Sequence, residues 1–140
     1  MNRREFLLMT AAVSLAPALP ARAGFDTGVN YLPGMVDDLL AEGRTVFVDF
    51  SASWCSTCRA QANIIKALQA ADPVYLQAIS FVSVDWDTYK DEALRHRLDI
   101  PRRSTLVVLK GDRELGRIVA GTSRGDIKAL MDLAVAAATS

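Results

Sequence analysis

The chain has 140 residues, of which 51% are hydrophobic, and it carries 16 basic and 16 acidic residues. This balance argues against a strongly basic nucleic-acid-binding surface, and no run of like charges suggests attachment to a membrane surface. The length suits one small domain with its own hydrophobic core.

Residues 1–23 have the three parts of a secretory signal: a charged start, an apolar middle and Ala21-Arg22-Ala23 at the end. The apolar middle is shorter than the roughly 20 residues that a membrane-spanning helix needs. Arg3-Arg4 resembles the pair of a twin-arginine export signal, which a receptor reads as an address; an ordinary secretory signal is the alternative. We therefore expect a periplasmic or otherwise exported protein, with cleavage after the signal and a folded domain over residues 24–140.

The remaining sequence alternates between helical and strand patterns. Thr45–Phe50 is a short apolar and β-branched run, which is typical of a buried strand. The elements expected in chain order are a helix over 33–42, a strand over 45–50, a helix over 58–71, a strand over 81–85, a helix over 88–97, hairpin strands over 106–109 and 115–119, and a helix from 123. This order predicts an α/β fold of three layers, with the first two strands parallel.

The two cysteines, Cys55 and Cys58, are separated only by Ser56 and Thr57. The stabilisation that a disulfide gives grows with the loop it closes, so a bond across this segment would contribute little. The pair lies where a predicted strand passes into a predicted helix. The positive end of the helix dipole stabilises a thiolate there, most of all at Cys55, the more exposed position. This favours a reactive dithiol, although two thiolates are also half of a four-ligand metal site.

The segment from Val46 to Arg59, Val-Phe-Val-Asp-Phe-Ser-Ala-Ser-Trp-Cys-Ser-Thr-Cys-Arg, resembles the active-site segment of the thioredoxin family. The similarity extends from about Pro33 to the end of the chain. Residues 55–59 and 72–76 are most similar to the C-terminal domain of the periplasmic thiol:disulfide interchange reductase. The resemblance implies a thioredoxin-like three-layer α/β/α sandwich with a mixed central sheet.

The resemblance also implies roles for individual residues. Cys55 matches the attacking nucleophile, Cys58 the resolving thiol, and Trp54 the aromatic residue that covers the site and contacts partners. Asp49 matches a buried carboxylate that helps to deprotonate the resolving thiol. Burial would raise the pKa of this carboxyl toward neutrality, where it can transfer a proton; the alternative is an aspartate at a strand end that faces solvent.

One position departs from the family pattern, which has a cis-proline facing the cysteines just before the predicted strand that follows Thr105. An alignment without gaps puts Ser104 there, whereas a shifted loop would make the Ile100–Pro101 bond cis. A cis bond before a residue other than proline costs about 2.5–4 kcal/mol, which favours a trans bond between Arg103 and Ser104. We expect Ser104 and Arg103 to border the substrate-binding surface and to alter substrate choice.

These features predict an exported thiol–disulfide oxidoreductase that needs no cofactor beyond its own Cys55–Cys58 disulfide. No histidine separates the cysteines, which favours reduction of protein or small-molecule disulfides over strong oxidation. A reductant outside the cytoplasm would need a membrane thiol electron donor, and we expect a monomer that binds no nucleic acid. Two alternatives use the same cysteines: a metal or iron–sulfur module, whose ligands could be shared across a dimer, and a binding module without turnover.

Overall fold

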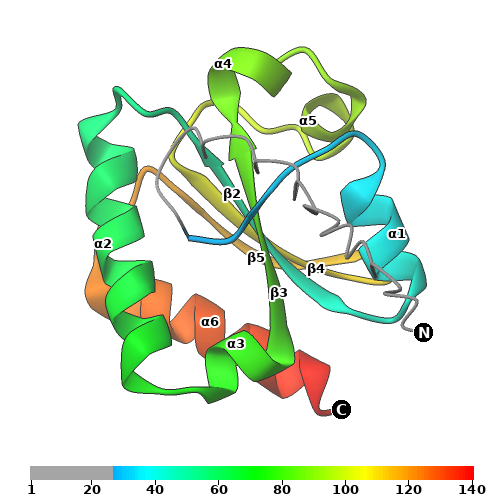
Figure 1. The fold of residues 1–140 in the computed structure, drawn as a ribbon, viewed down its shortest axis with the longest axis vertical. Helices are drawn as coiled ribbons and strands as arrows, with labels where there is room; N and C mark the ends of the chain where they lie inside the picture. The colour runs from blue at the N-terminus through cyan, green and yellow to red at the C-terminus, as the bar shows by residue number, and fades with distance from the viewer. Residues whose placement is uncertain (1–26) are drawn as a thin grey trace, which may run out of the picture.

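The computed structural model describes residues 27–140, which form a five-stranded sheet with helices on both faces (Figure 1). The strands are β1 (Val29–Asn30), β2 (Thr45–Ser51), β3 (Ile79–Asp85), β4 (Thr105–Lys110) and β5 (Arg113–Val119). The helices are α1 (Met35–Ala41), α2 (Ser56–Ala71), α3 (Val74–Ala78), α4 (Trp86–Tyr89), α5 (Ala93–Arg97) and α6 (Arg124–Ala138). The predicted export signal, residues 1–23, lies outside the described residues. Within 27–140, none of the helices combines the length and apolar character needed to cross a membrane.

The sheet is mixed, with the strand order β1-β3-β2-β4-β5. β1 and β2 run parallel to β3, whereas β4 is antiparallel to β2 and β5 is antiparallel to β4. The parallel β2–β3 pair requires a long crossover, which α2 and α3 provide, and the β4–β5 hairpin needs only a tight turn at Gly111. In this arrangement the end of β2 lies beside the start of β4, because Phe50 pairs with Thr105.

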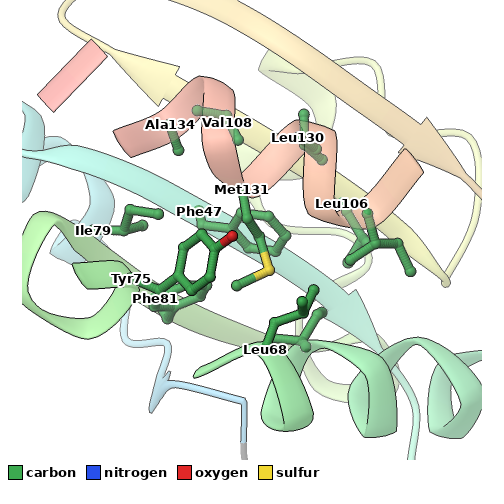
Figure 2. Close-up of a cluster of buried hydrophobic side chains, with 12 residues drawn as sticks. Phe47, Leu68, Tyr75, Ile79, Phe81, Leu106, Val108, Leu130, Met131 and Ala134 are labelled. Carbon is green, nitrogen blue, oxygen red and sulfur yellow. The ribbon is translucent and has the colours of Figure 1, made fainter. Parts of the chain in front are cut away.

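β2 is buried along its whole length, and its alternate side chains enter two separate cores. On one face, Phe47 joins a cluster between the sheet and helices α2, α3 and α6, which Figure 2 shows. On the other face, Val46, Val48 and Phe50 pack against α1, α4 and α5. A strand covered on both faces has a nearly continuous apolar sequence, which β2 has apart from Asp49 and the residues at its two ends, Thr45 and Ser51. The predicted three-layer α/β/α sandwich with a mixed central sheet is therefore confirmed.

Some predicted elements need correction. β1 and α3 are absent from the predicted elements, since a strand of two residues and a helix of five are too short to show a period. The single helix predicted over 88–97 is wrong, because this segment divides between α4 and α5. The Asp85 carboxylate caps α4 by accepting from the Thr88 N–H, and the Glu92 carboxylate caps α5 by accepting from the Leu94 N–H. Each of these caps fixes the start of a helix, so the segment forms two short helices in place of one long helix.

The segment before β1 is fixed by a close approach of two backbones. A Cβ atom on Gly28 would lie 2.4 Å from the Phe81 carbonyl oxygen of β3, so only glycine fits there. The neighbouring Thr27 is buried, and its carbonyl accepts a hydrogen bond from Gln69 Nε2 of α2 at 2.8 Å. Thr27 is thus held between β3 and α2.

We expect Gly28→Ala to lower the free energy of unfolding by about 1–3 kcal/mol, because the added methyl group would push β1 away from β3. Gly125→Ala is the matched control, since a Cβ there meets only Ser123 Oγ at 3.8 Å and alanine favours the helical backbone of α6. It should raise the free energy of unfolding by about 0.4–1 kcal/mol. Urea denaturation measures both, and equal effects of the two substitutions would contradict the close approach at Gly28.

Candidate active site

Two loops meet at the C-terminal end of β2 and form the candidate site. Residues 52–55 lead from β2 into α2 and carry Trp54 and Cys55, and residues 101–104 lead into β4 and end at Ser104. The Ser104 N–H donates to the Phe50 carbonyl at 2.7 Å, which extends the β2–β4 pairing beyond Thr105. This bond brings Ser104 to the cysteines, although 46 positions separate it from Cys58.

Cys55 is the N-cap residue of α2, and Cys58 lies in the first turn of that helix. Cys55 Sγ accepts a hydrogen bond from the Cys58 backbone N–H at 3.2 Å. This N–H is one of those at a helix start that have no partner within the helix, and the sulfur supplies its acceptor. Ser104 Oγ lies 3.1 Å from Cys55 Sγ and 3.0 Å from Cys58 Sγ. Both cysteines are free thiols in the structure.

Cys55 is less accessible than its position in the sequence predicts, with 4% of its surface exposed. It packs with Ala52 and Cys58, and Trp86 of α4 lies against this small cluster. The expectation of an exposed cysteine at the helix start is therefore wrong in this respect, because α4 and the Ser104 loop cover the junction between β2 and α2.

The two thiols differ in acidity. Burial acts to raise the pKa of Cys55, but hydrogen bonds with Cys58, Ser104 and Arg103 outweigh it and lower that pKa to about 7. Burial raises the pKa of Cys58, and the negative charge on the neighbouring Cys55 sulfur raises it further. A single negative charge on the pair is therefore carried by Cys55, while Cys58 keeps its proton.

Asp49 lies on the α2-facing side of β2 and is only 2% exposed, which excludes the solvent-facing alternative. Thr27 Oγ1 donates to its Oδ2 at 2.9 Å, whereas Oδ1 has no hydrogen-bond partner among residues 27–140. Burial raises the pKa of Asp49 from 3.8 to about 7, and the Thr27 bond acts in the opposite direction. Both protonation states of Asp49 are therefore populated near neutral pH, as a proton-transfer group requires.

Trp54 is 60% exposed, and two contacts hold its indole ring. Its Nε1 donates to the Asp87 carboxylate at 2.8 Å, and the Arg103 guanidinium lies 4.4 Å from its ring centre. A cation over an aromatic face contributes about 0.5–2 kcal/mol. Within the described part of the chain, Arg103 Nε has no hydrogen-bond partner. The structure thus brings Trp54, Arg103 and Ser104, which the sequence assigns to substrate contact, to the same end of the molecule as Cys55.

Gln61 is a site residue that the sequence pattern does not single out. Its side chain is fully buried in α2, and its Nε2 donates to the carbonyls of Ser104 at 3.0 Å and Gly121 at 2.9 Å. Buried polar groups need partners, and here the partners come from loops far along the chain. The one signal available in the sequence is that Gln61 follows Cys58 by three positions and therefore shares its helix face.

Every peptide bond within residues 27–140 is trans, so the alternative in which Ile100–Pro101 is cis is wrong, and the Arg103–Ser104 bond is trans as well. Across the same residues, no group of three or more His, Cys, Asp or Glu side chains is arranged to hold a metal ion. Cys55 and Cys58 supply two ligands at most, so a four-ligand metal or iron–sulfur site on this pair would need further ligands from another molecule, such as a second copy of the chain.

Comparison with known proteins gives consistent matches. The family model described as Thioredoxin matches residues 35–133. Thioredoxin H5 of Oryza sativa subsp. japonica is 30% identical over 61% of this chain, and a Thioredoxin H-type of Picea mariana is 30% identical over 69% of it. Among solved structures, Trxlp from Edwardsiella tarda is 27% identical with a TM-score of 0.64, covering 74% of this chain and 98% of that one.

The extent of these matches differs between the two kinds of relative. The chain spans 59% of the length of the Oryza sativa protein and 71% of the Picea mariana protein. Mitochondrial Thioredoxin 3 from Saccharomyces cerevisiae has a TM-score of 0.62 at 21% identity and covers 77% of this chain and 97% of that one, a likeness of fold alone. The thioredoxin-like fold predicted from the sequence is confirmed.

The raised pKa of Asp49 predicts that stability falls as the pH rises. The carboxyl has a pKa of 3.8 in the unfolded chain and of about 7 in the folded protein. The protonated carboxyl therefore stabilises the folded state fully below pH 3.8, and this stabilisation is lost as the pH rises through about 7. We expect Asp49→Asn to match the wild type at about pH 4 and to exceed its free energy of unfolding by on the order of 1–4 kcal/mol at about pH 8. Denaturant unfolding across this range measures the difference, and a constant difference would disprove a buried Asp49 proton.

Proposed function

The chain belongs to the thioredoxin family, and from this premise we propose that it is a thiol–disulfide oxidoreductase in which Cys55 attacks and Cys58 resolves. The asymmetry of the two sulfurs carries the proposal. Cys55 accepts the Cys58 N–H at 3.2 Å at the start of α2, and Cys58 is almost fully buried one turn later. Disulfide exchange needs one thiol that ionises readily and a second, within reach, that stays protonated until the first has reacted.

In the first step, the Cys55 thiolate attacks one sulfur of a substrate disulfide. A bond forms between Cys55 Sγ and that sulfur, the substrate S–S bond breaks, and the other substrate sulfur leaves as a thiolate. A thiol whose pKa lies near the ambient pH combines a large ionised fraction with good nucleophilicity, and the pKa of Cys55 is about 7.

In the second step, Cys58 attacks Cys55 Sγ and releases the remaining substrate sulfur as a thiolate. Cys58 must first lose its proton, and we assign that proton to the Asp49 carboxylate, whose pKa of about 7 suits it as an acceptor. The product is a Cys55–Cys58 disulfide, and the two electrons that the dithiol has lost are now on the two substrate sulfurs.

The substrate is proposed to be a protein or small-molecule disulfide that approaches over Trp54. The Trp54 indole is 60% exposed beside the reactive cysteines, and tryptophan is enriched among the residues that contribute most to binding at contact sites. Asp87 and Arg103 hold this ring in place, so it offers a rigid surface at little cost in conformational entropy. Arg103 and Ser104 would border the same contact.

The proposed direction is reduction of the substrate. Ser56 and Thr57, between the cysteines, carry neither charge nor imidazole, so they lack the strong thiolate stabilisation that makes a dithiol pair an oxidant. The resulting disulfide would be reduced again by a membrane thiol electron donor. The proposed subfamily is the C-terminal domain of the periplasmic thiol:disulfide interchange reductase, on the resemblance of residues 55–59 and 72–76, and the protein is proposed to act as a monomer.

The proposed location is the periplasm or another exported compartment, on the basis of residues 1–23. Cleavage after Ala23 would make Thr27 the fourth residue of the mature protein, so the hydrogen bond from Thr27 to Asp49 would be kept. The exported form would thus retain every residue that the mechanism uses.

We expect Cys55→Ser to abolish the reduction of insulin disulfides, because a serine hydroxyl is not ionised near neutral pH and forms no mixed disulfide. Cys58→Ser should still attack but should not resolve, so it should accumulate a covalent complex between Cys55 and the substrate. Non-reducing electrophoresis and mass spectrometry detect this complex. Equal trapping by the two single variants would refute the division of roles.

The twin-arginine resemblance predicts that replacing Arg3 and Arg4 by lysine keeps the protein in the cytoplasm, since the receptor reads the arginine pair. An ordinary secretory signal would tolerate the change, because lysine preserves the positive charge. Immunoblots of cytoplasmic and periplasmic fractions measure the distribution. Wild-type export of the double variant would exclude the twin-arginine route, and retention of the wild-type protein would exclude the exported location.

A further inference from the structure

The Ser104 hydroxyl lies between the two reactive sulfurs. Its Oγ is 3.1 Å from Cys55 Sγ and 3.0 Å from Cys58 Sγ, and both distances are within hydrogen-bond range for sulfur. A hydroxyl has one proton to donate and two lone pairs with which to accept. It can therefore donate to only one sulfur, and the other sulfur must donate to it.

Only one assignment satisfies both bonds when the reduced pair carries one negative charge. The ionised sulfur cannot donate, so it accepts the hydroxyl proton, and the remaining thiol donates its S–H to Ser104 Oγ. Cys55 Sγ already accepts the Cys58 backbone N–H, so it is the sulfur better placed to carry the charge. The chain of donors runs from the Cys58 thiol through Ser104 Oγ to Cys55 Sγ.

The backbone of Ser104 adopts a conformation that serine rarely takes. Its φ is 62°, in the left-handed region, which costs a non-glycine residue on the order of 1 kcal/mol or more. Glycine would adopt this conformation without strain. The feature that serine adds at this strained position is its hydroxyl.

Three hydrogen bonds hold the Ser104 backbone in this position. The N–H donates to the Phe50 carbonyl at 2.7 Å, at the end of β2. The carbonyl accepts from the Ala120 N–H at 2.8 Å and from Gln61 Nε2 at 3.0 Å. Because Gln61 belongs to the same helix as the cysteines, it ties the Ser104 loop directly to α2.

We propose that Ser104 is a catalytic hydrogen-bond donor, whose hydroxyl donates to the Cys55 thiolate, accepts from the Cys58 thiol, and so sets both the location of the charge and the reduction potential of the pair. The proposal rests on the oxidoreductase function proposed above and deepens it. It gives Ser104 a part in the chemistry that is separate from contact with the substrate.

The hydroxyl acts unequally on the reduced and oxidised states. A hydrogen bond to a charged thiolate is stronger than one to a neutral disulfide sulfur. When the pair gives up two electrons and its remaining proton to form the Cys55–Cys58 disulfide, this extra stabilisation is lost. Ser104 therefore favours the reduced form, and the pair is less reducing than it would be with an apolar side chain at this position.

Hydrogen bonds with Cys58 and Arg103 also lower the pKa of Cys55 and must stay constant in a test. The other charged side chains on the elements around the site are Arg59 in α2, Asp49 in β2 and Asp87 in α4. Substitutions at Ser104 change none of these charges, so a change in the pKa of Cys55 reports on the hydroxyl itself.

Ser104→Ala and Ser104→Gly form a matched pair, because both remove the hydroxyl but only glycine relieves the positive φ. The glycine variant should therefore resist denaturant better than the alanine variant. We expect both variants to raise the pKa of Cys55 by about one unit, which lowers the thiolate fraction about tenfold at acid pH. At about pH 9, where wild-type Cys55 is almost entirely thiolate, we also expect an approximately tenfold shift of the equilibrium with glutathione toward the protein disulfide, or about 30 mV, and a smaller shift at neutral pH. Ultraviolet absorbance follows the thiolate, and mass spectrometry after brief alkylation identifies Cys55 as its carrier.

Thiolate fractions at acid pH within twofold of the wild type in both variants, together with glutathione equilibria within twofold at about pH 9, would overturn the proposal. A change confined to the alanine variant would also overturn it, because the cause would then be the backbone. The titration needs no turnover, so it distinguishes this proposal from the proposed function. If the wild-type protein reduces no disulfide substrate, the oxidoreductase function fails, while the titration still decides whether Ser104 donates to Cys55.

Discussion

The hydrogen bond from the Ser104 N–H to the Phe50 carbonyl joins the two loops on which the reactive site depends. It continues the antiparallel pairing of β2 with β4 by one residue, at the point where β2 turns toward Cys55. The register of that pairing is set by burial, since a slip of one residue would turn the apolar side chains of β2 to the wrong cores. The placement of one hydroxyl between two sulfurs thus follows from the packing of the whole sheet.

Burial acts to raise the pKa of both Cys55 and Asp49. The hydrogen bonds that each group accepts decide whether its pKa ends above or below the ordinary value. Cys55 and Asp49 are both nearly inaccessible, and burial alone would raise both pKa values. Cys55 has donors from three residues and is made more acidic, whereas Asp49 has Thr27 as its one donor among the described residues and is made less acidic. Both pKa values converge near 7, where a thiolate nucleophile and a carboxylate proton acceptor can work at the same pH.

The parts of the fold that the sequence predicts are the long or strongly patterned ones. β2 is recognisable from Thr45–Phe50 because a strand buried on both faces needs a continuous apolar run, and α2 because it lacks glycine and proline. β1 carries too few residues for a pattern, and the division of α4 from α5 depends on carboxylate caps that a hydrophobic period does not reveal. These elements depend on contacts with partners elsewhere in the chain, which local sequence does not specify.

The sequence by itself determined that Cys55 and Cys58 stand at a strand-to-helix junction, and that Asp49 lies within an apolar strand. Residue types and local spacing suffice for this, because the chemistry of a helix start and the cost of burying a carboxyl are local properties. Only the tertiary structure decided that Cys55 is covered, that Gln61 and Thr27 support the site, and that Ser104 Oγ lies between both sulfurs with a positive φ. Those facts arise from contacts between segments far apart in the chain, which exist only once the sheet has assembled.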